Sequence, residues 1–107
     1  MKLIITIVSK EDSSIVQKEL LKQRFFVTKL SSTGGFLKHG NTTFMIGAKD
    51  QDVDTIINII SEYSRTRKEM VPASIARDFG YSTISPTEVT VGGATLFIMD
   101  VEKMIKL

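Results

Sequence analysis

Thr28–Gly47 reads TKLSSTGGFLKHGNTTFMIG, and this stretch decides the fold because it begins and ends as β-strand around a glycine-bearing connection. A connection that only reverses the chain needs about two to five turn-forming residues. This one places Phe36 and Leu37 between Gly34-Gly35 and Gly40-Asn41. Apolar side chains at a loop tip need a cover, and flanking glycines let a partner approach the backbone closely. We therefore predict that this loop binds something and that the remaining residues build its platform.

Strands and helices are predicted on both sides of this stretch. The expected elements are a strand over Leu3–Val8, a helix over Ile15–Gln23, strands over Arg24–Leu30 and Asn41–Ala48, a helix carrying Val53, Ile56, Ile57, Ile60 and Tyr63 at helical spacing, and a last strand over Glu88–Met99. The order strand, helix, strand, strand, helix, strand is the split βαβ or βαββαβ arrangement. The sequence thus predicts a ferredoxin-like α+β fold.

The first and last predicted strands are apolar at positions that point to both faces of the sheet. Two helices cover only one face of a sheet of this size. The other face therefore needs a cover as well, and we predict that another copy of the chain supplies it.

The segment Arg65–Thr87 joins the second predicted helix to the last strand and is longer than most connections. It is basic at its start and then mixes Ser, Thr, Pro and Gly with a few apolar residues. We predict an irregular loop that is mobile until something binds. Gly92-Gly93, inside the last strand, predicts a bulge or a place where another backbone or a ligand comes close.

The composition is that of an ordinary soluble protein. The chain has 107 residues, a formal net charge of +2 and no cysteine. It offers no disulfide framework, no thiolate nucleophile and no cysteine metal site. No segment has the length and apolar character of a membrane span, and we predict a cytoplasmic protein.

Motifs of catalysis are missing from the sequence. The single histidine, His39, has no nearby carboxylate to orient it, and Asp50, Asp52 and Asp54 lack the pattern of a cation-binding loop. We therefore expect neither an enzyme nor a metal site. The strands also lack the aromatic platform of RNA-recognition modules, so RNA binding stays a weaker alternative.

A small anionic ligand fits the loop better. Glycine N–H groups, Lys38 and the amide of Asn41 suit phosphate oxygens or the edges of a nucleobase. Phe36 and Leu37 would either enclose a base or pack against a neighbouring subunit, and the residues alone leave both interpretations open.

Four motifs carry a resemblance to a known family. Thr28-Lys29-Leu30 is followed by TGGFL at 33–37, by GNTTF at 40–44 and by VGGATLF at 91–97. Together they resemble the PII-like cyclic-di-AMP receptor family of Gram-positive bacteria, over nearly the whole chain. The resemblance implies one PII-like domain over 1–107, with a T-loop-like segment near 34–41 and a B-loop-like segment near 65–87. It also implies a homotrimer that holds cyclic-di-AMP in the clefts between subunits and signals to a downstream protein, with no cofactor.

The resemblance implies six ligand-binding residues, namely Thr28, Gly35, Phe36, Leu37, Asn41 and Gly47. One position departs from the family pattern, because Phe26 stands where an arginine is expected to pair with phosphate. Arg24, two residues earlier on the predicted strand, would replace that charge. Alternatively, Phe26 stacks on a base and Lys29 or Lys38 supplies the charge.

Two main hypotheses follow from the sequence. The chain is a receptor for cyclic-di-AMP, or it is a PII-like paralogue without that ligand that regulates a partner protein or binds another small anion. RNA binding by a ferredoxin-like module is the third.

Overall fold

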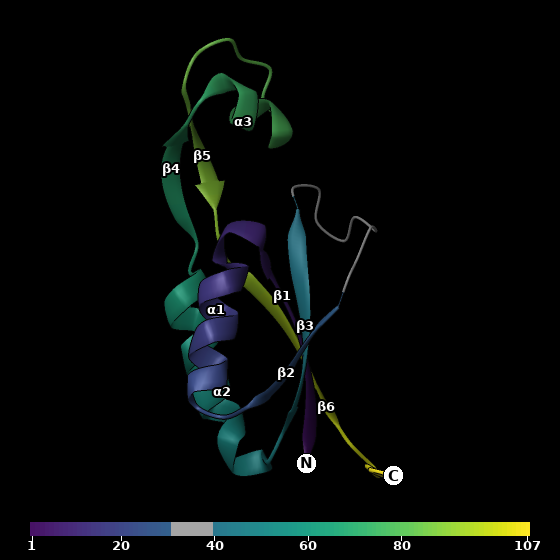
Figure 1. Ribbon diagram of the computed structural model, residues 1–107. Coiled ribbons are helices and arrows are strands. Elements are labelled where there is room, and N and C mark those ends of the chain that lie inside the picture. Colours follow the sequence, from purple (N-terminus) through teal and green to yellow (C-terminus); the bar gives the residue numbers. More distant parts are fainter. Residues whose placement is uncertain (31–39) are drawn as a thin grey trace.

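The computed structural model describes residues 1–30 and 40–107 (Figure 1). Its elements are β1 (Lys2–Ser9), α1 (Lys10–Lys22), β2 (Phe26–Leu30), β3 (Asn41–Ala48), the 3-10 turn η1 (Asp50–Asp52), α2 (Val53–Ser64), β4 (Arg67–Val71), α3 (Ala73–Asp78), β5 (Thr87–Val91) and β6 (Ala94–Asp100).

β1 lies inside a four-stranded sheet with the strand order β2-β3-β1-β6. It pairs antiparallel with β3, from Lys2 opposite Ala48 to Ser9 opposite Asn41. It also pairs antiparallel with β6 along nearly its whole length, and β2 completes the sheet at the outer edge of β3. With one helix after β1 and one after β3, this is the predicted βαββαβ order, and the ferredoxin-like fold is confirmed.

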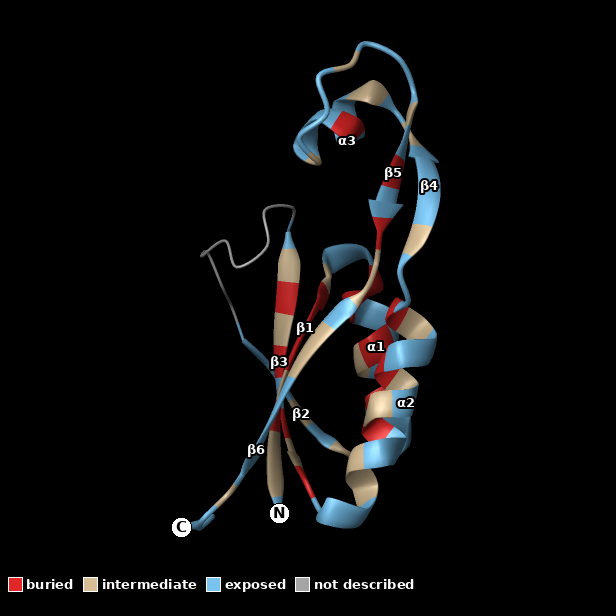
Figure 2. Ribbon diagram, turned by 180° about the vertical axis from the view of Figure 1, so that it is seen from behind, coloured by how far each residue is buried: buried red, intermediate tan, exposed pale blue. Residues whose placement is uncertain are grey.

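α1 and α2 pack on one face of this sheet, and the core lies between them and the strands (Figures 1 and 2). α2 packs against the sheet because its apolar residues at helical spacing share one side of the helix. Ile56 and Ile60, one helical turn apart, are both fully buried. The buried core residues are Ile4, Val8, Val16, Leu20, Phe44, Ile46, Ala48, Ile56 and Ile60. Burying one such large side chain stabilises the fold by about 1.5–3 kcal/mol.

The segment that follows α2 differs from its prediction as an irregular loop over 65–87. β4 and β5 pair antiparallel, from Arg67 opposite Val91 to Val71 opposite Thr87, and α3 lies between them in the chain. We call residues 67–91 the arm. Ala76, Val89 and Val91 form a small separate core inside it, and it projects beyond the sheet (Figure 1). The prediction is wrong for β4 and α3, where local strand pairing and this small core order the chain.

The predicted last strand over Glu88–Met99 is two strands, β5 and β6, which belong to different sheets. Gly92 and Gly93 separate them with φ angles of +81° and +86°. A Cβ atom on Gly92 would lie 2.4 Å from the carbonyl oxygen of Arg65. The prediction that another backbone approaches this glycine pair is confirmed. The strand prediction missed the break because both halves are rich in β-branched or large apolar residues.

Candidate functional site

The open face of the sheet, meaning the face opposite α1 and α2, carries a pocket of about 490 Å³. Phe26 pairs with Gly47 across β2 and β3, and Thr28 pairs with Met45. Side chains alternate along a strand, so these residues point away from the core to which Ile46 belongs. Three predicted site residues, Phe26, Thr28 and Gly47, therefore come together in one pocket.

The C-terminal tail, residues 101–107, forms another wall of the same pocket. Its start is held in place, because the backbone N–H of Val101 donates a hydrogen bond of 3.1 Å to the carbonyl oxygen of Met1. Just before it, Asp100 forms an ion pair with the ammonium of Lys2. The tail residues that line the pocket are Val101, Lys103, Met104 and Lys106. The sequence analysis did not predict that the tail lines this pocket. The available signal was the pair of lysines, Lys103 and Lys106, on either side of two apolar residues.

The pocket is lined mainly by apolar residues, together with Lys103 and Lys106 from the tail. The Phe26 ring is 82% exposed, so its face is open for stacking. A Cβ atom on Gly47 would meet only the Met1 methyl group, at an ordinary 3.6 Å. Nothing within one chain therefore requires glycine at this position, whereas a ligand lying against the backbone would. A ligand with flat aromatic rings and separate negatively charged groups suits this surface.

Asn41 lies apart from the other predicted residues, at the opposite end of β3 from Gly47. The separation is roughly 20 Å at the rise of a β-strand. Asn41 lines a different pocket, together with Lys10, Ser13 and Lys29. The predicted residues Gly35, Phe36 and Leu37, and with them Lys38 and His39, lie outside the described residues.

Comparison with known families decides what kind of protein carries this pocket. A model of the cyclic-di-AMP receptor family matches residues 1–107. The chain belongs to the cyclic-di-AMP receptor family. The crystal structure of a functionally unknown protein from Pediococcus pentosaceus ATCC 25745 is similar, with a TM-score of 0.78 and 37% sequence identity over 99% of this chain and 96% of that chain. The predicted family membership is thereby confirmed.

Arg24 lies away from the pocket that contains Phe26 in this cyclic-di-AMP receptor family member. It lies before β2, in a turn with φ +64°. Its N–H donates to the carbonyl oxygen of Leu21 at 2.9 Å, and the N–H of Phe25 donates to that of Leu20 at 3.3 Å. These bonds form a Schellman cap at the end of α1. The expected alternation of Arg24 with Phe26 along one strand is wrong, and Arg24 does not line the pocket.

Lys29 does not line this pocket either. It pairs with Phe44, a core residue, and so points to the helix-covered side of the sheet. There it lines the pocket that contains Asn41. Within one chain Lys29 therefore lies apart from Phe26, and its suggested role toward the ligand stays a prediction.

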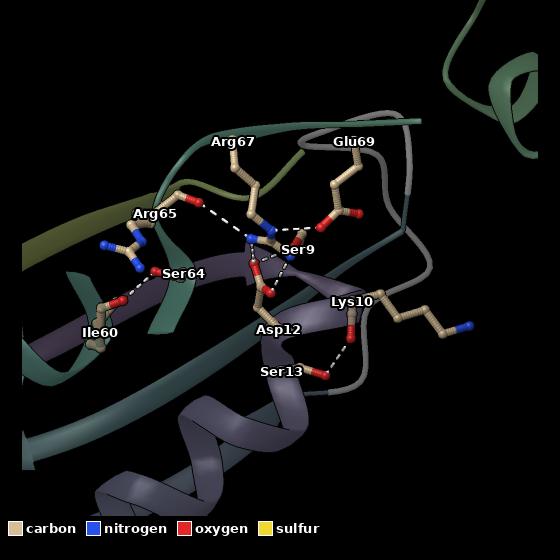
Figure 3. A network of polar contacts seen from close by, with 9 residues as sticks. All are labelled: Ser9, Lys10, Asp12, Ser13, Ile60, Ser64, Arg65, Arg67 and Glu69. Atoms are coloured by element: carbon tan, nitrogen blue, oxygen red, sulfur yellow. Dashed lines mark hydrogen bonds and ion pairs between the residues drawn. The ribbon is translucent and has the colours of Figure 1, made fainter. Parts of the chain in front are cut away.

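A polar junction ties the arm to the start of α1 in this family member (Figure 3). The guanidinium of Arg67 on β4 donates to the carboxylate of Asp12 at 2.9 and 3.1 Å and to Glu69 at 2.8 Å. Asp12 is buried and also accepts a hydrogen bond of 2.9 Å from the Ser9 hydroxyl. The bonds to Asp12 and then Glu69 raise the pKa of Arg67 above its usual value. The arm is thus tied to α1 through a permanent charge that is held by a buried partner.

We expect Asp12→Asn to loosen the arm and leave the sheet intact. The change keeps the shape of the side chain but removes the charge that pairs with Arg67, and it costs about 1–2 kcal/mol because Arg67 is partly exposed. Amide hydrogens of residues 67–91 should exchange faster, while those of β1 and β3 keep their protection. Glu69→Gln is the matched control, since it touches the same guanidinium from an exposed position. Equal effects of the two changes would contradict the role of Asp12.

Neither a membrane span nor a metal cluster stands out in the part of the chain that the structure describes. No helix there is long and apolar enough to cross a bilayer. Nor do three His, Cys, Asp or Glu side chains of residues 1–30 and 40–107 come together as metal ligands would.

Proposed function

We propose that this member of the family is a PII-like receptor that binds cyclic-di-AMP in the clefts between the subunits of a homotrimer. The observation that supports it best is the pocket on the open face, where Phe26, Thr28 and Gly47 converge. Phe26 offers an aromatic face to an adenine, Thr28 a hydroxyl group and Gly47 a bare backbone, which together suit a purine nucleotide.

The open face itself supports assembly. Phe97 pairs with Ile5 and Met99 pairs with Leu3, so β6 and β1 present these side chains opposite the helices. Phe97 is 46% exposed, and Met45 and Met99 are exposed beside it. A continuous apolar surface of this kind marks an interface, and copies of the same chain are the proposed cover.

The separation of Asn41 from the pocket supports a site shared between subunits. A ligand that fills the pocket beside Thr28 and Gly47 does not extend along β3 to Asn41 of the same chain, because Asn41 lines a different pocket. Both ends of β3 contribute to one site if Asn41 comes from one subunit, and Gly47 with its neighbour Thr28 comes from the next. The proposed cleft between neighbours satisfies this condition.

The arm is the proposed route to a downstream protein. It corresponds to the B-loop-like segment, and it exposes Met70, Ile75 and Ile84 away from the sheet. Ligand in the cleft would change how the arm and the T-loop-like segment near 34–41 are presented to that protein.

A second candidate function follows from Phe26. A phenyl ring cannot pair with phosphate as an arginine does, and losing a hydrogen bond to a charged group costs about 1.5–3 kcal/mol. A PII-like paralogue that ignores cyclic-di-AMP and regulates a partner through the arm would also carry these residues.

Calorimetric titration of the full chain with cyclic-di-AMP distinguishes the two candidates. The receptor should bind one ligand per subunit and discriminate against ATP and cyclic-di-GMP, which differ in their phosphates or bases. No heat with cyclic-di-AMP, together with an unchanged melting temperature, would contradict the receptor and favour the paralogue.

A further inference from the structure

The C-terminal tail supplies the positive charge of the pocket. Resting on the proposed function, we propose that Lys103 and Lys106 bind the phosphate groups of cyclic-di-AMP. They would take over the role of the arginine that the family pattern has at position 26, where this chain has Phe26. The two lysines and Phe26 line the same pocket, so the ring and the charges face one ligand.

The start of the tail is tied to the sheet. The hydrogen bond from Val101 to Met1 continues the pairing of β6 with β1 by one residue. The ion pair between Lys2 and Asp100 lies beside it. Lys103 follows two residues after this anchor and lines the same pocket as Phe26 and Gly47.

The charge of the ligand needs partners that the rest of the pocket does not provide. A cyclic dinucleotide carries two negatively charged phosphodiesters, and lysine binds phosphate as a point charge. Lys103 and Lys106 are the only cationic side chains among the described residues that line the pocket. Met1 also lines the pocket, but its terminal ammonium is already paired with Asp50 at 2.9 Å.

Both lysines are available for a ligand. No carboxylate side chain lines the pocket within residues 1–30 and 40–107. Over the same residues, neither Lys103 nor Lys106 takes part in an ion pair, although Lys2, Lys22 and Lys68 do. Two ammonium groups three residues apart, beside an apolar surface and an open ring, match the two phosphates and the bases of one dinucleotide.

The test compares charge removal in the tail with the same charge removal elsewhere. The variants are Lys103→Gln, Lys106→Gln and the double variant, and the matched control is Lys18→Gln/Lys22→Gln on α1, which covers the opposite face of the sheet. Each protein is titrated with cyclic-di-AMP in the calorimeter at low and at physiological salt, and its melting temperature is measured without ligand.

We expect each tail variant to weaken binding about tenfold and the double variant about a hundredfold, with melting temperatures unchanged. The double variant should also lose most of the salt dependence of binding, because screening acts on the charges that have been removed. The control should bind like the original protein, and Lys103→Arg should retain most of the affinity.

Two results overturn the inference and are distinguishable. If the original protein binds and the double variant binds equally well, the lysines do not contact phosphate, while the proposed function stands. If the original protein does not bind cyclic-di-AMP at all, the proposed function fails and the inference fails with it.

Discussion

Replacing Phe97 with glutamate should convert the proposed trimer into monomers. Phe97 lies on the open face, because it pairs with Ile5 of β1, whose neighbour Ile4 belongs to the core on the other side. In the proposed trimer its side chain is covered by a neighbouring subunit. A carboxylate buried there without a partner costs several kcal/mol, so association should weaken roughly a hundredfold or more.

Ile98→Glu is the matched control for this change. Ile98 is the next residue of β6 and is 43% exposed, against 46% for Phe97, but it points to the helix-covered side. Both residues accept a charge in the single chain at similar cost. Sedimentation velocity should therefore show monomers for Phe97→Glu and trimers for Ile98→Glu. Trimers in both variants would place the interface elsewhere.

Gly92→Ala should destabilise the protein by about 2–4 kcal/mol, since it combines an unfavourable backbone conformation with a steric clash. The backbone of Gly92 has φ +81°, and the added methyl group would lie 2.4 Å from the carbonyl oxygen of Arg65 and 2.6 Å from a guanidinium nitrogen of Arg67. The carbonyl cannot retreat without moving the end of α2. Urea unfolding measures the loss, and hydrogen exchange should place it at the junction between arm and sheet.

Gly80→Ala separates the two causes. Gly80 has a similar φ of +87°, but a methyl group there would meet nothing within 4 Å. It should therefore cost only about 1 kcal/mol, the backbone part alone. Equal losses of stability at Gly80 and Gly92 would mean that the close contact between Gly92 and Arg65 contributes nothing.

The fold was predictable because its main signals are local and periodic. The spacing of Ile56 and Ile60 predicts one buried helix face, and the order of the elements then allows few topologies. The arm was harder to predict. Its strands are short and its core is small, so no periodic pattern distinguishes them from an irregular connection.

The candidate site was predictable only in part, and the errors have physical causes. Phe26, Thr28 and Gly47 share a pocket because alternation along β2 and β3 is regular. The prediction that Arg24 shares a strand face with Phe26 is wrong, because alternation does not extend into the cap of a helix, where the chain turns through a left-handed conformation.

The tail shows a different limit of sequence reasoning. Lys103 and Lys106 belong to no repeating pattern, and only the register of β6 on β1 brings them to residues that are distant in the sequence. Sites assembled from both ends of a chain in this way require the three-dimensional structure.

Native mass spectrometry of the full chain, titrated with cyclic-di-AMP, counts subunits and ligands in the same particle and so shows whether the binding sites lie between subunits. We expect a trimer that takes up at most three ligands, with no ligand on residual monomer. A monomer that binds cyclic-di-AMP by itself, or a trimer that never binds it, would contradict a receptor whose sites lie between its subunits.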